Sequence, residues 1–458
     1  MNIIICGAGR VGSTIAKSLS AQNHSITIID QSSDDIQKIN DSIDVKGVVG
    51  MGTFPSVLEK ANAKEADMII AVTRSDEVNM LICQISHSIF KISKKIARIR
   101  SQEYLDQKYI SLYDNSNLPI DVIISPEIEV AKSLQRKLEA PGALDNVNFA
   151  KNKISMLVIQ INEKCPIANT PLNKLTKMFP DLEANILGVL RNENFLILKK
   201  TDSMKVNDKA YVVINSAQMK RTLLAFGHEE TIAKKILIIG GGNIGFNLAK
   251  NIETTFEEVR VKIIESDKKK AELIASQLNN TIVINGDGLE EDVLAEANVE
   301  ESETVLALTN DDENNIMACV QVEKFSKDKR TIALVNKQNY SLLQSSLKID
   351  DLVDPRLTTV STILKHVHKG TIETVYTLLD GEYEFIEAEV LETSELISKS
   401  IKDSNLPKEI RIGAVVRGKD VVIPKSDFKF EKKDVVVFLS KREHLQKVES
   451  LFRISSLA

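Results

Sequence analysis

The chain has few of the features that mark secreted, membrane-spanning or nucleic-acid-binding proteins. Only four of its 458 residues are cysteines, and none of them has the C-x-x-C spacing of a metal or redox site. Its longest apolar runs, such as residues 68–72, have the length of a strand, far below the roughly 20 residues that cross a bilayer. The net charge is −5 without a basic block, which argues against nucleic-acid binding. The chain begins directly in an apolar run, so we expect no signal peptide.

Composition indicates an ordinary globular protein that works in a reducing compartment. The apolar fraction is 43% and the charged fraction 27%, and the length suits about three or four domains. The cysteines lie in or beside apolar segments, so we expect them to be buried small hydrophobic residues rather than disulfide partners or metal ligands. They are Cys6, Cys83, Cys165 and Cys319.

The most informative feature is a glycine motif that occurs twice. Residues 2–12 and residues 235–245 each read as a short apolar run followed by G-x-G-x-x-G and then a helical pattern. A strand, a glycine turn and a helix in this order indicate a dinucleotide-binding unit. A single motif is weak evidence, but two in one chain with matching residues after each are strong evidence.

The similarity between the two halves continues beyond the glycines. Asp30 and Glu265 each end an apolar strand, 18 and 20 residues after the third glycine, which suits an acid that binds an adenosine ribose. A fourth strand follows in each half, and the next helix begins near Thr73 or Thr309. A carboxylate three residues after each threonine has the spacing of a capping box.

Strands alternate with helices through each half, which predicts an α/β fold with a doubly wound parallel sheet. Hairpin-rich segments follow both halves, around residues 154–214 and 383–439. The predicted fold is therefore two tandem Rossmann-like domains, each followed by a small α+β lobe, which we expect to pack on its neighbour or on another subunit. The expected boundaries are 1–140, 141–226, 232–369 and 370–458.

These residues and their order resemble the RCK family (regulator of K⁺ conductance, also called KTN). Beyond the glycine motifs, the resemblance rests on residues 66–80 and 96–104. Two copies in one chain are similar to the regulatory subunits of bacterial Trk potassium uptake systems. The resemblance implies a non-enzymatic gating ring, usually a homotetramer, that binds NAD(H) or, as a regulatory ligand, ATP or ADP. It also implies a cytoplasmic location, peripheral at the inner face of the cell membrane, through a TrkH/TrkG-like potassium-channel subunit.

The resemblance also implies which residues form the nucleotide sites. The glycines would let the backbone approach phosphates, and the strand-end acids would take ribose hydroxyls, which favours NAD(H) or an adenine nucleotide over a 2′-phosphorylated one. Arginines would meet phosphate in the first half, and Asp287 could accept a hydrogen bond from adenine in the second. The expected set is Gly7, Gly9, Arg10, Val11, Gly12, Asp30, Thr73, Arg98, Arg100, Gly240, Gly242, Asn243, Ile244, Gly245, Glu265, Asp287 and Thr309.

The arginines of the first half have no counterparts in the second. Asn243 stands where the first half has Arg10, and residues 333–335 carry no charge where the first half has Arg98 and Arg100. Because arginine binds phosphate in a bidentate manner and keeps its charge, we expect the first pocket to tolerate more phosphate charge, as in ATP or ADP. The second pocket, with less positive charge, should prefer NAD(H) or bind weakly. Two arginines on one face of a covered sheet need a partner, and we expect that partner to be phosphate rather than a carboxylate.

Two other functions fit parts of the sequence. An NAD-dependent oxidoreductase with a duplicated cofactor domain would need an acid or base in a substrate pocket, and Tyr104 and Lys108 have the Tyr-x-x-x-Lys spacing of short-chain dehydrogenases. This pair comes too early in the chain for that family, so we expect no catalytic residue. A nucleotide-binding scaffold without a membrane partner is the other alternative. No metal site is expected.

Overall fold

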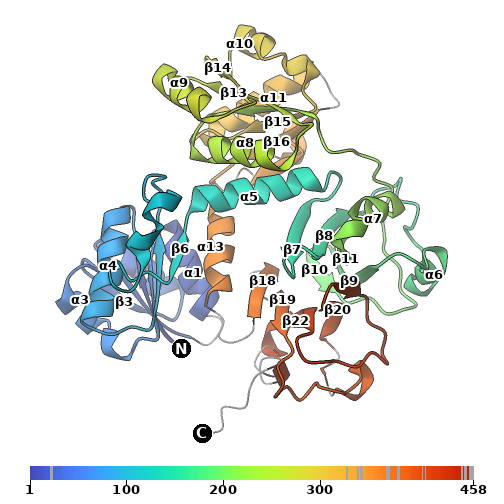
Figure 1. The fold of residues 1–458 in the computed structure, drawn as a ribbon, viewed down its shortest axis with the longest axis horizontal. Coiled ribbons are helices and arrows are strands. Elements are labelled where there is room, and N and C mark those ends of the chain that lie inside the picture. Colours follow the sequence, from blue (N-terminus) through green and yellow to red (C-terminus); the bar gives the residue numbers. More distant parts are fainter. Residues whose placement is uncertain are drawn as a thin grey trace. The chain divides into compact units, whose positions relative to one another are not determined.

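A computed structural model describes residues 1–20, 24–325, 329–337, 340, 344–367, 372–378, 382–404, 406–407, 409–444, 447 and 451–452. The chain divides into two compact units, each made of two segments that are far apart in sequence (Figure 1). One unit contains Met1–Gln135 and Ala233–His366, and the other contains Arg136–Ile232 and Val367–Ala458. The expected boundary between residues 369 and 370 lies outside the described residues.

The first unit begins with a six-stranded parallel sheet whose strand order is β3-β2-β1-β4-β5-β6. This is the doubly wound order of a Rossmann-like domain, in which the direction of winding reverses beside the first strand. Its strands are β1 (Asn2–Cys6), β2 (Ser25–Asp30), β3 (Lys46–Val49), β4 (Met68–Ala71), β5 (Lys94–Arg98) and β6 (Val122–Ile124), and its helices are α1 (Arg10–Ser20), α2 (Ser33–Ser42), α3 (Pro55–Lys60), α4 (Asp76–Ser88) and α5 (Pro126–Glu139).

The second half of this unit repeats the same architecture. The sheet order is β14-β13-β12-β15-β16-β17, again with all strands parallel. The predicted pair of doubly wound domains is therefore confirmed. The elements are β12 (Lys235–Ile239), β13 (Arg260–Glu265), β14 (Ile282–Asn285), β15 (Thr304–Ala307), β16 (Arg330–Leu334) and β17 (Asp351–Val353), with α8 (Asn243–Thr255), α9 (Lys268–Gln277), α10 (Glu291–Glu296), α11 (Asp312–Phe325), α12 (Gln344–Leu347) and α13 (Pro355–Lys365).

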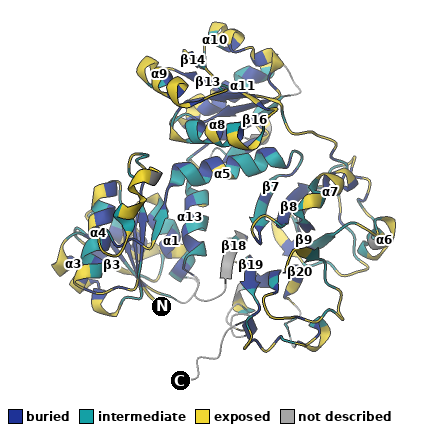
Figure 2. Ribbon diagram, viewed as in Figure 1, coloured by how far each residue is buried: buried dark blue, intermediate teal, exposed yellow. Residues whose placement is uncertain are grey.

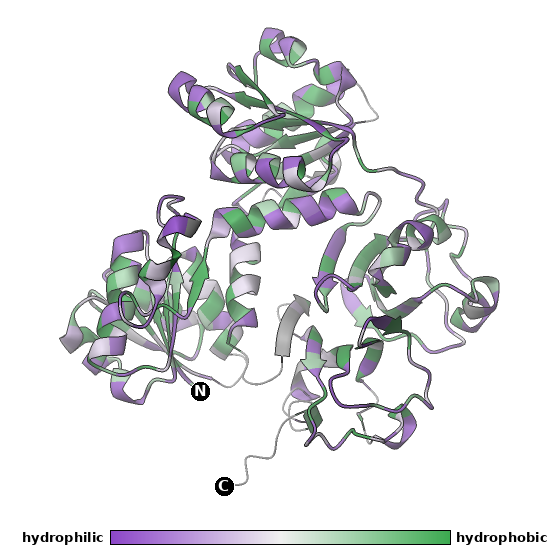
Figure 3. Cartoon of the chain, in the orientation of Figure 1, coloured by the Kyte–Doolittle hydropathy of each residue, from purple (hydrophilic) through white to green (hydrophobic). Residues whose placement is uncertain are grey.

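The sheets of both domains are buried on two faces. Figure 2 shows their central strands as buried, whereas the outer surfaces of helices such as α3 and α9 are exposed. Apolar residues follow the same division in Figure 3, where the strands are mainly hydrophobic. The four cysteines are buried and unbonded, as expected. Burial raises the pKa of the Cys83 and Cys319 thiols to about 12, so both are protonated and inert.

Helix α13 follows the second sheet in sequence but packs on the first domain, against α1 and β6. The ammonium group of Lys94 in β5 donates a hydrogen bond to the carbonyl of His366, directly after α13. On the other domain, the side chain of Gln135 in α5 donates to the hydroxyl of Thr255 at the end of α8, at 3.3 Å. The last helix of each repeat therefore contacts the other repeat.

The second unit contains two antiparallel five-stranded sheets with the same topology. Their orders are β10-β9-β11-β8-β7 and β21-β20-β22-β19-β18, so each strand of one lobe has a counterpart in the other. The first lobe has β7 (Asp145–Phe149), β8 (Ile154–Gln160), β9 (Ala184–Arg191), β10 (Asn194–Leu196) and β11 (Lys209–Asn215), with α6 (Leu172–Met178) and α7 (Met219–Ala225); the second has β18 (Ile372–Leu378), β19 (Tyr383–Glu389), β20 (Arg411–Arg417), β21 (Asp420–Val422) and β22 (Val435–Lys441).

One hydrophobic core joins these two lobes. It contains Tyr211 from the first lobe and Phe385 from the second, whose rings stack with centroids 5.9 Å apart. Phe195 packs against Tyr383 in the same core, with ring centroids 4.8 Å apart. Each small lobe therefore gains from its copy the apolar contact that a sheet of this size needs, as expected for a domain that is marginal alone.

No helix in the described part of the chain is long and apolar enough to span a bilayer. The same residues contain no cluster of histidine, cysteine, aspartate and glutamate that could bind a metal ion.

Candidate nucleotide-binding sites

Both glycine motifs form a tight turn between the first strand of a domain and its first helix. The amide of Gly7 donates to the carbonyl of Ile29, and Gly7 has a φ of 112°, a conformation that side chains rarely adopt. A Cβ atom on Gly12 would lie 1.8 Å from the carbonyl oxygen of Gly7, so the helix can close on the turn only without a side chain. In the second motif Gly240 has a φ of 108°, and a Cβ on Gly245 would lie 2.1 Å from its carbonyl.

The middle glycine of each motif is open instead. A Cβ on Gly9 would meet nothing within 4 Å, and one on Gly242 would have only the Lys270 ammonium nearby, at 3.9 Å. The three glycines of a motif therefore have different roles: the first makes the turn, the third allows close packing, and the second leaves backbone accessible from outside. This is the arrangement that a phosphate-binding glycine loop requires.

The two strand-end carboxylates support the glycine loops. Asp30 accepts hydrogen bonds from the amides of Ala8 at 2.6 Å and Ser32 at 2.9 Å. Glu265, which is buried, accepts equivalent bonds from Gly241 at 2.9 Å and Asp267 at 3.0 Å. A carboxylate has about four acceptor positions, so Asp30 can accept from further donors such as ribose hydroxyls. The oxygens of Glu265 are also approached by the Ser266 hydroxyl and the Lys270 ammonium, both at 3.5 Å. The ribose contact itself stays a prediction.

Thr73 and Thr309 do not cap the helices that follow them, which corrects the capping-box expectation. Ser75 is the N-cap of α4, and its hydroxyl accepts from the amide of Val78. Each threonine hydroxyl instead donates to the side-chain oxygen of a buried asparagine, Asn79 or Asn315, at 2.7 Å. The threonines are therefore held at the carboxyl end of the fourth strand, beside the glycine turn.

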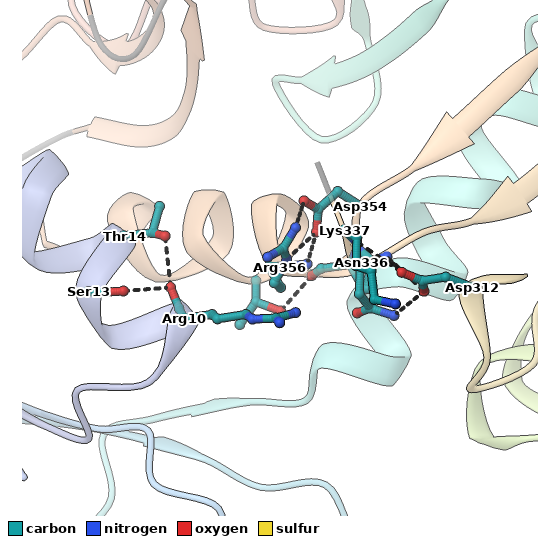
Figure 4. A network of polar contacts seen from close by, with 10 residues as sticks. Arg10, Ser13, Thr14, Asp312, Asn336, Lys337, Asp354 and Arg356 are labelled. Carbon is teal, nitrogen blue, oxygen red and sulfur yellow. Dashed lines mark hydrogen bonds and ion pairs between the residues drawn. The ribbon is translucent and has the colours of Figure 1, made fainter. Parts of the chain in front are cut away.

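Asp76 and Asp312 also differ from the capping expectation. Asp76 accepts from the backbone amides of Arg100 and Ser101 at 2.9 and 2.8 Å. Asp312 accepts from the amides of Asn336 and Lys337, both at 2.9 Å (Figure 4). Both carboxylates are buried and fasten the segment after the fifth strand to the helix after the fourth.

The three arginines of the first half lie in different environments. Arg98 is half-buried and donates to the carbonyl of Thr73 at 2.6 Å, and burial lowers its pKa. Arg100 lies beyond the end of β5, and its Nε donates at 2.8 Å to the buried carboxylate of Glu127 in α5. A carboxylate is therefore the partner of Arg100, where phosphate was expected. Its side chain remains 55% exposed.

Arg10 is the exposed first residue of α1. Its carbonyl accepts hydrogen bonds from Ser13 and Thr14, which fixes the first turn of the helix. In Figure 4 its side chain extends toward the Arg356–Asp354 ion pair at the start of α13. A cation at a helix N-terminus is unfavourable next to the dipole unless an anion is near, so Arg10 stays a candidate phosphate contact.

The second motif differs from the first in its charged residues. Asn243 is exposed at the start of α8, Ile244 is half-buried like Val11, and Asp287 accepts from the amide of Leu289 within its own turn. Lys270 was not expected in the site. Its ammonium lies 3.5 Å from Glu265. The run Lys268–Lys270 after the strand-end acid was the sequence signal that could have identified it.

Tyr104 and Lys108 each contact a neighbouring carboxylate. The hydroxyl of Tyr104 lies 3.4 Å from Glu77, whose charge raises its pKa, whereas a catalytic tyrosine needs a lowered one. The ammonium of Lys108 pairs with Asp106 at 3.1 Å. Their geometry gives no support to the oxidoreductase alternative.

Two protein-family models and several known proteins match this chain. The family model of the TrkA-N domain matches residues 3–126 and 236–355, and that of the TrkA-C domain matches residues 385–453. The Trk system potassium uptake protein TrkA of Azorhizobium caulinodans is 44% identical over 455 residues, with 99% of each chain covered. The protein of the same name from Haemophilus influenzae is 34% identical, covering 100% of this chain and 99% of its own.

Solved structures show the same fold at low sequence identity. A crystal structure of the GsuK RCK domain aligns with a TM-score of 0.61 and 17% identity over 98% of this chain and 94% of its own. The GsuK channel bound to NAD aligns with a TM-score of 0.60 and 16% identity over 98% of this chain and 78% of its own.

Proposed function

This chain belongs to the TrkA family of Trk system potassium uptake proteins, and we propose that it is the nucleotide-sensing regulatory subunit of such a system. The observation that carries the proposal is the pair of glycine turns, each with an open middle glycine and a strand-end carboxylate bound to the loop. Two complete loops in a chain without a catalytic pair among its described residues suit sensing better than turnover. The four-domain division 1–140, 141–226, 232–369 and 370–458 is part of the proposal.

The proposed ligands are NAD(H) and, as a regulatory ligand, ATP or ADP. A solved channel with this fold is described as bound to NAD, which supports a nicotinamide dinucleotide as one ligand. In each pocket the glycine loop would hold phosphate, and Asp30 or Glu265 would accept from ribose. Thr73, Thr309 and Asp287 would line the adenosine side, and Arg10, Arg98 and Arg100 would supply positive charge in the first pocket.

Helix α13, which packs on the other repeat, gives a route from ligand binding to a conformational change. A phosphate on the first glycine loop would lie at the start of α1, and α13 from the other repeat packs on α1. Two poses of α13 with different affinities for the ligand would make binding a switch, with a coupling free energy of about 1–3 kcal/mol. We propose that this movement reaches a TrkH/TrkG-like membrane channel subunit through a homotetramer at the inner face of the cell membrane.

Calorimetric titration of the full chain with NADH, ATP and ADP tests this function, with absorbance at the NADH band followed in parallel. The expected result is saturable binding without NADH oxidation, weakened by Asp30→Ala or Glu265→Ala. Potassium uptake by cells that lack the native subunit should then require the wild-type chain and respond to the same variants. Absence of binding to all three nucleotides would refute the sensor, and NADH oxidation with a keto acid would favour the oxidoreductase alternative.

A further inference from the structure

The helix that follows each strand-end acid has its N-cap at the same position in both repeats. The residue whose amide the cap binds, however, carries opposite charge in the two repeats. In the first repeat the Ser32 hydroxyl accepts from the amide of Asp35 at 3.2 Å. In the second, the Asp267 carboxylate accepts from the amide of Lys270 at 2.9 Å. Asp35 and Lys270 are therefore equivalent positions in the two pockets, and a carboxylate in one is replaced by an ammonium in the other.

The two side chains also make different contacts. Asp35 forms an ion pair within its own helix, 3.7 Å from the Lys38 ammonium. Lys270 reaches back across the site to Glu265, 3.5 Å from the same carboxylate oxygen that accepts from the Gly241 amide. Its ammonium is also the nearest atom to the open face of Gly242. The cation of the second pocket thus lies over the loop where a phosphate would bind.

The ammonium of Lys270 supplies the positive charge that the glycine loop of the second pocket lacks. The loop residue after the middle glycine is Asn243 where the first motif has Arg10. The buried carboxylate of Glu265 next to the loop would repel a phosphate unless a cation offset it. Lys270 is 41% exposed, so its flexible chain can turn from Glu265 to an incoming ligand.

We infer that Lys270 is a phosphate-contacting residue of the second pocket and that it enables this pocket to bind the diphosphate of an adenine nucleotide without a loop arginine. The inference rests on the proposed function, because it assumes that a nucleotide binds there. On binding, the ammonium of Lys270 turns from Glu265 to the phosphate, and the released carboxylate oxygen becomes available to a ribose hydroxyl. The expectation that the second pocket lacks a cation for phosphate is thereby revised, since both pockets then hold one.

Titration of the full-length chain with ADP tests this contact. Lys270→Gln should weaken one of the two binding events about tenfold, the size of a single charge-assisted hydrogen bond. Lys270→Arg should restore most of the affinity. The matched control is Lys269→Gln, which removes the same charge from an exposed neighbour and should leave both events unchanged. Arg10→Gln should weaken the other event, and the double variant should show both losses, because the pockets are separate.

Competition of adenosine and ADP against NADH distinguishes a phosphate contact from an effect on Glu265. The Lys270→Gln penalty should appear for ADP and be absent for adenosine. Equal penalties for both ligands, or equal behaviour of the Lys269 and Lys270 variants, would overturn the inference while nucleotide sensing stands. Failure of the wild-type chain to bind any nucleotide would overturn both.

Discussion

Arg191 and Asp208 form a bidentate ion pair in the first small lobe, with Nε–Oδ1 and Nη2–Oδ2 distances of 2.8 and 2.7 Å. Arg417 and Asp434 repeat it in the second lobe with the same two distances. In both lobes the arginine is the last residue of a strand, β9 or β20, and the aspartate directly precedes the strand that pairs with it, β11 or β22. The family model of the C-terminal domain matches only the second lobe, so this pair supports the common architecture of the two lobes at the level of single residues.

The Arg191–Asp208 pair leads to a stability prediction. The Asp208 side chain is 1% exposed and also accepts from the amide of Lys205, whereas Arg191 is 25% exposed. Arg191→Met would leave this carboxylate buried without its cation, so we expect the free energy of unfolding of the small-lobe unit to fall by about 3 kcal/mol. Chemical denaturation with a probe in that unit measures the change.

An exposed cation in the same lobe provides the control. Lys209→Ala should change the free energy of unfolding by less than about 0.5 kcal/mol. Arg191→Met with Asp208→Leu should recover part of the loss, because an apolar pair avoids the buried charge. If the single variant Arg191→Met were as stable as wild type, Asp208 would be well solvated and would not depend on the arginine.

The sequence predicted those parts of the fold that depend on local pattern. The two glycine motifs, the strand-end acids and the alternation of strands and helices were enough to predict two doubly wound sheets. The predicted hairpins of both lobes are present as β9–β10 and β20–β21. Strand β7 was missed because Asp145–Phe149 is mostly polar and lies at a sheet edge, where burial selects few β-branched residues.

Contacts between distant residues could not be predicted in this way. The apolar face of α13 has the same pattern whether it packs on its own repeat or on the other, so its contact with α1 follows from tertiary structure alone. Arg100 and Glu127 are 27 residues apart, and no spacing rule pairs them. The run Lys268–Lys270 indicates a cation near Glu265, but it does not show which ammonium turns back over that carboxylate.

The unequal surroundings of the glycines in the first motif lead to a second prediction. Gly12→Ala would place a Cβ 1.8 Å from the carbonyl oxygen of Gly7, which forces α1 away from the turn. We expect a loss of about 3 kcal/mol in stability, as for an overpacked core, together with loss of nucleotide binding. Gly9→Ala meets nothing within 4 Å and should change stability by less than about 1 kcal/mol.

Nucleotide binding by the two glycine variants distinguishes a ligand contact from a purely structural effect. Gly9→Ala should still weaken the first nucleotide site, because its methyl group would stand where a phosphate approaches the backbone. Thermal unfolding without ligand and calorimetric titration of the same sample give both values. If Gly9→Ala bound NADH as tightly as wild type, the middle glycine would not be part of the ligand surface.

We expect His366 to make the stability of the first unit sensitive to pH. Burial, with the positive charges of Lys94 and Lys365, lowers the pKa of His366 below its ordinary value of 6.5, and Glu129 opposes this shift. The unfolded chain therefore binds a proton more readily than the folded one as the pH falls through 6.5. The free energy of unfolding of the first unit should decrease in that range and stop decreasing below the folded pKa.

His366→Asn removes the titrating ring but keeps the backbone carbonyl that accepts from Lys94. Its thermal unfolding midpoint should fall less between pH 7 and pH 5 than that of the wild-type chain. His87→Asn, in α4, should retain the full wild-type decrease. The same decrease in the His366 variant would mean that other groups cause the acid sensitivity of this unit. A smaller decrease would show that protonation of one side chain loosens the contact between the repeats, the contact through which nucleotide binding is proposed to act.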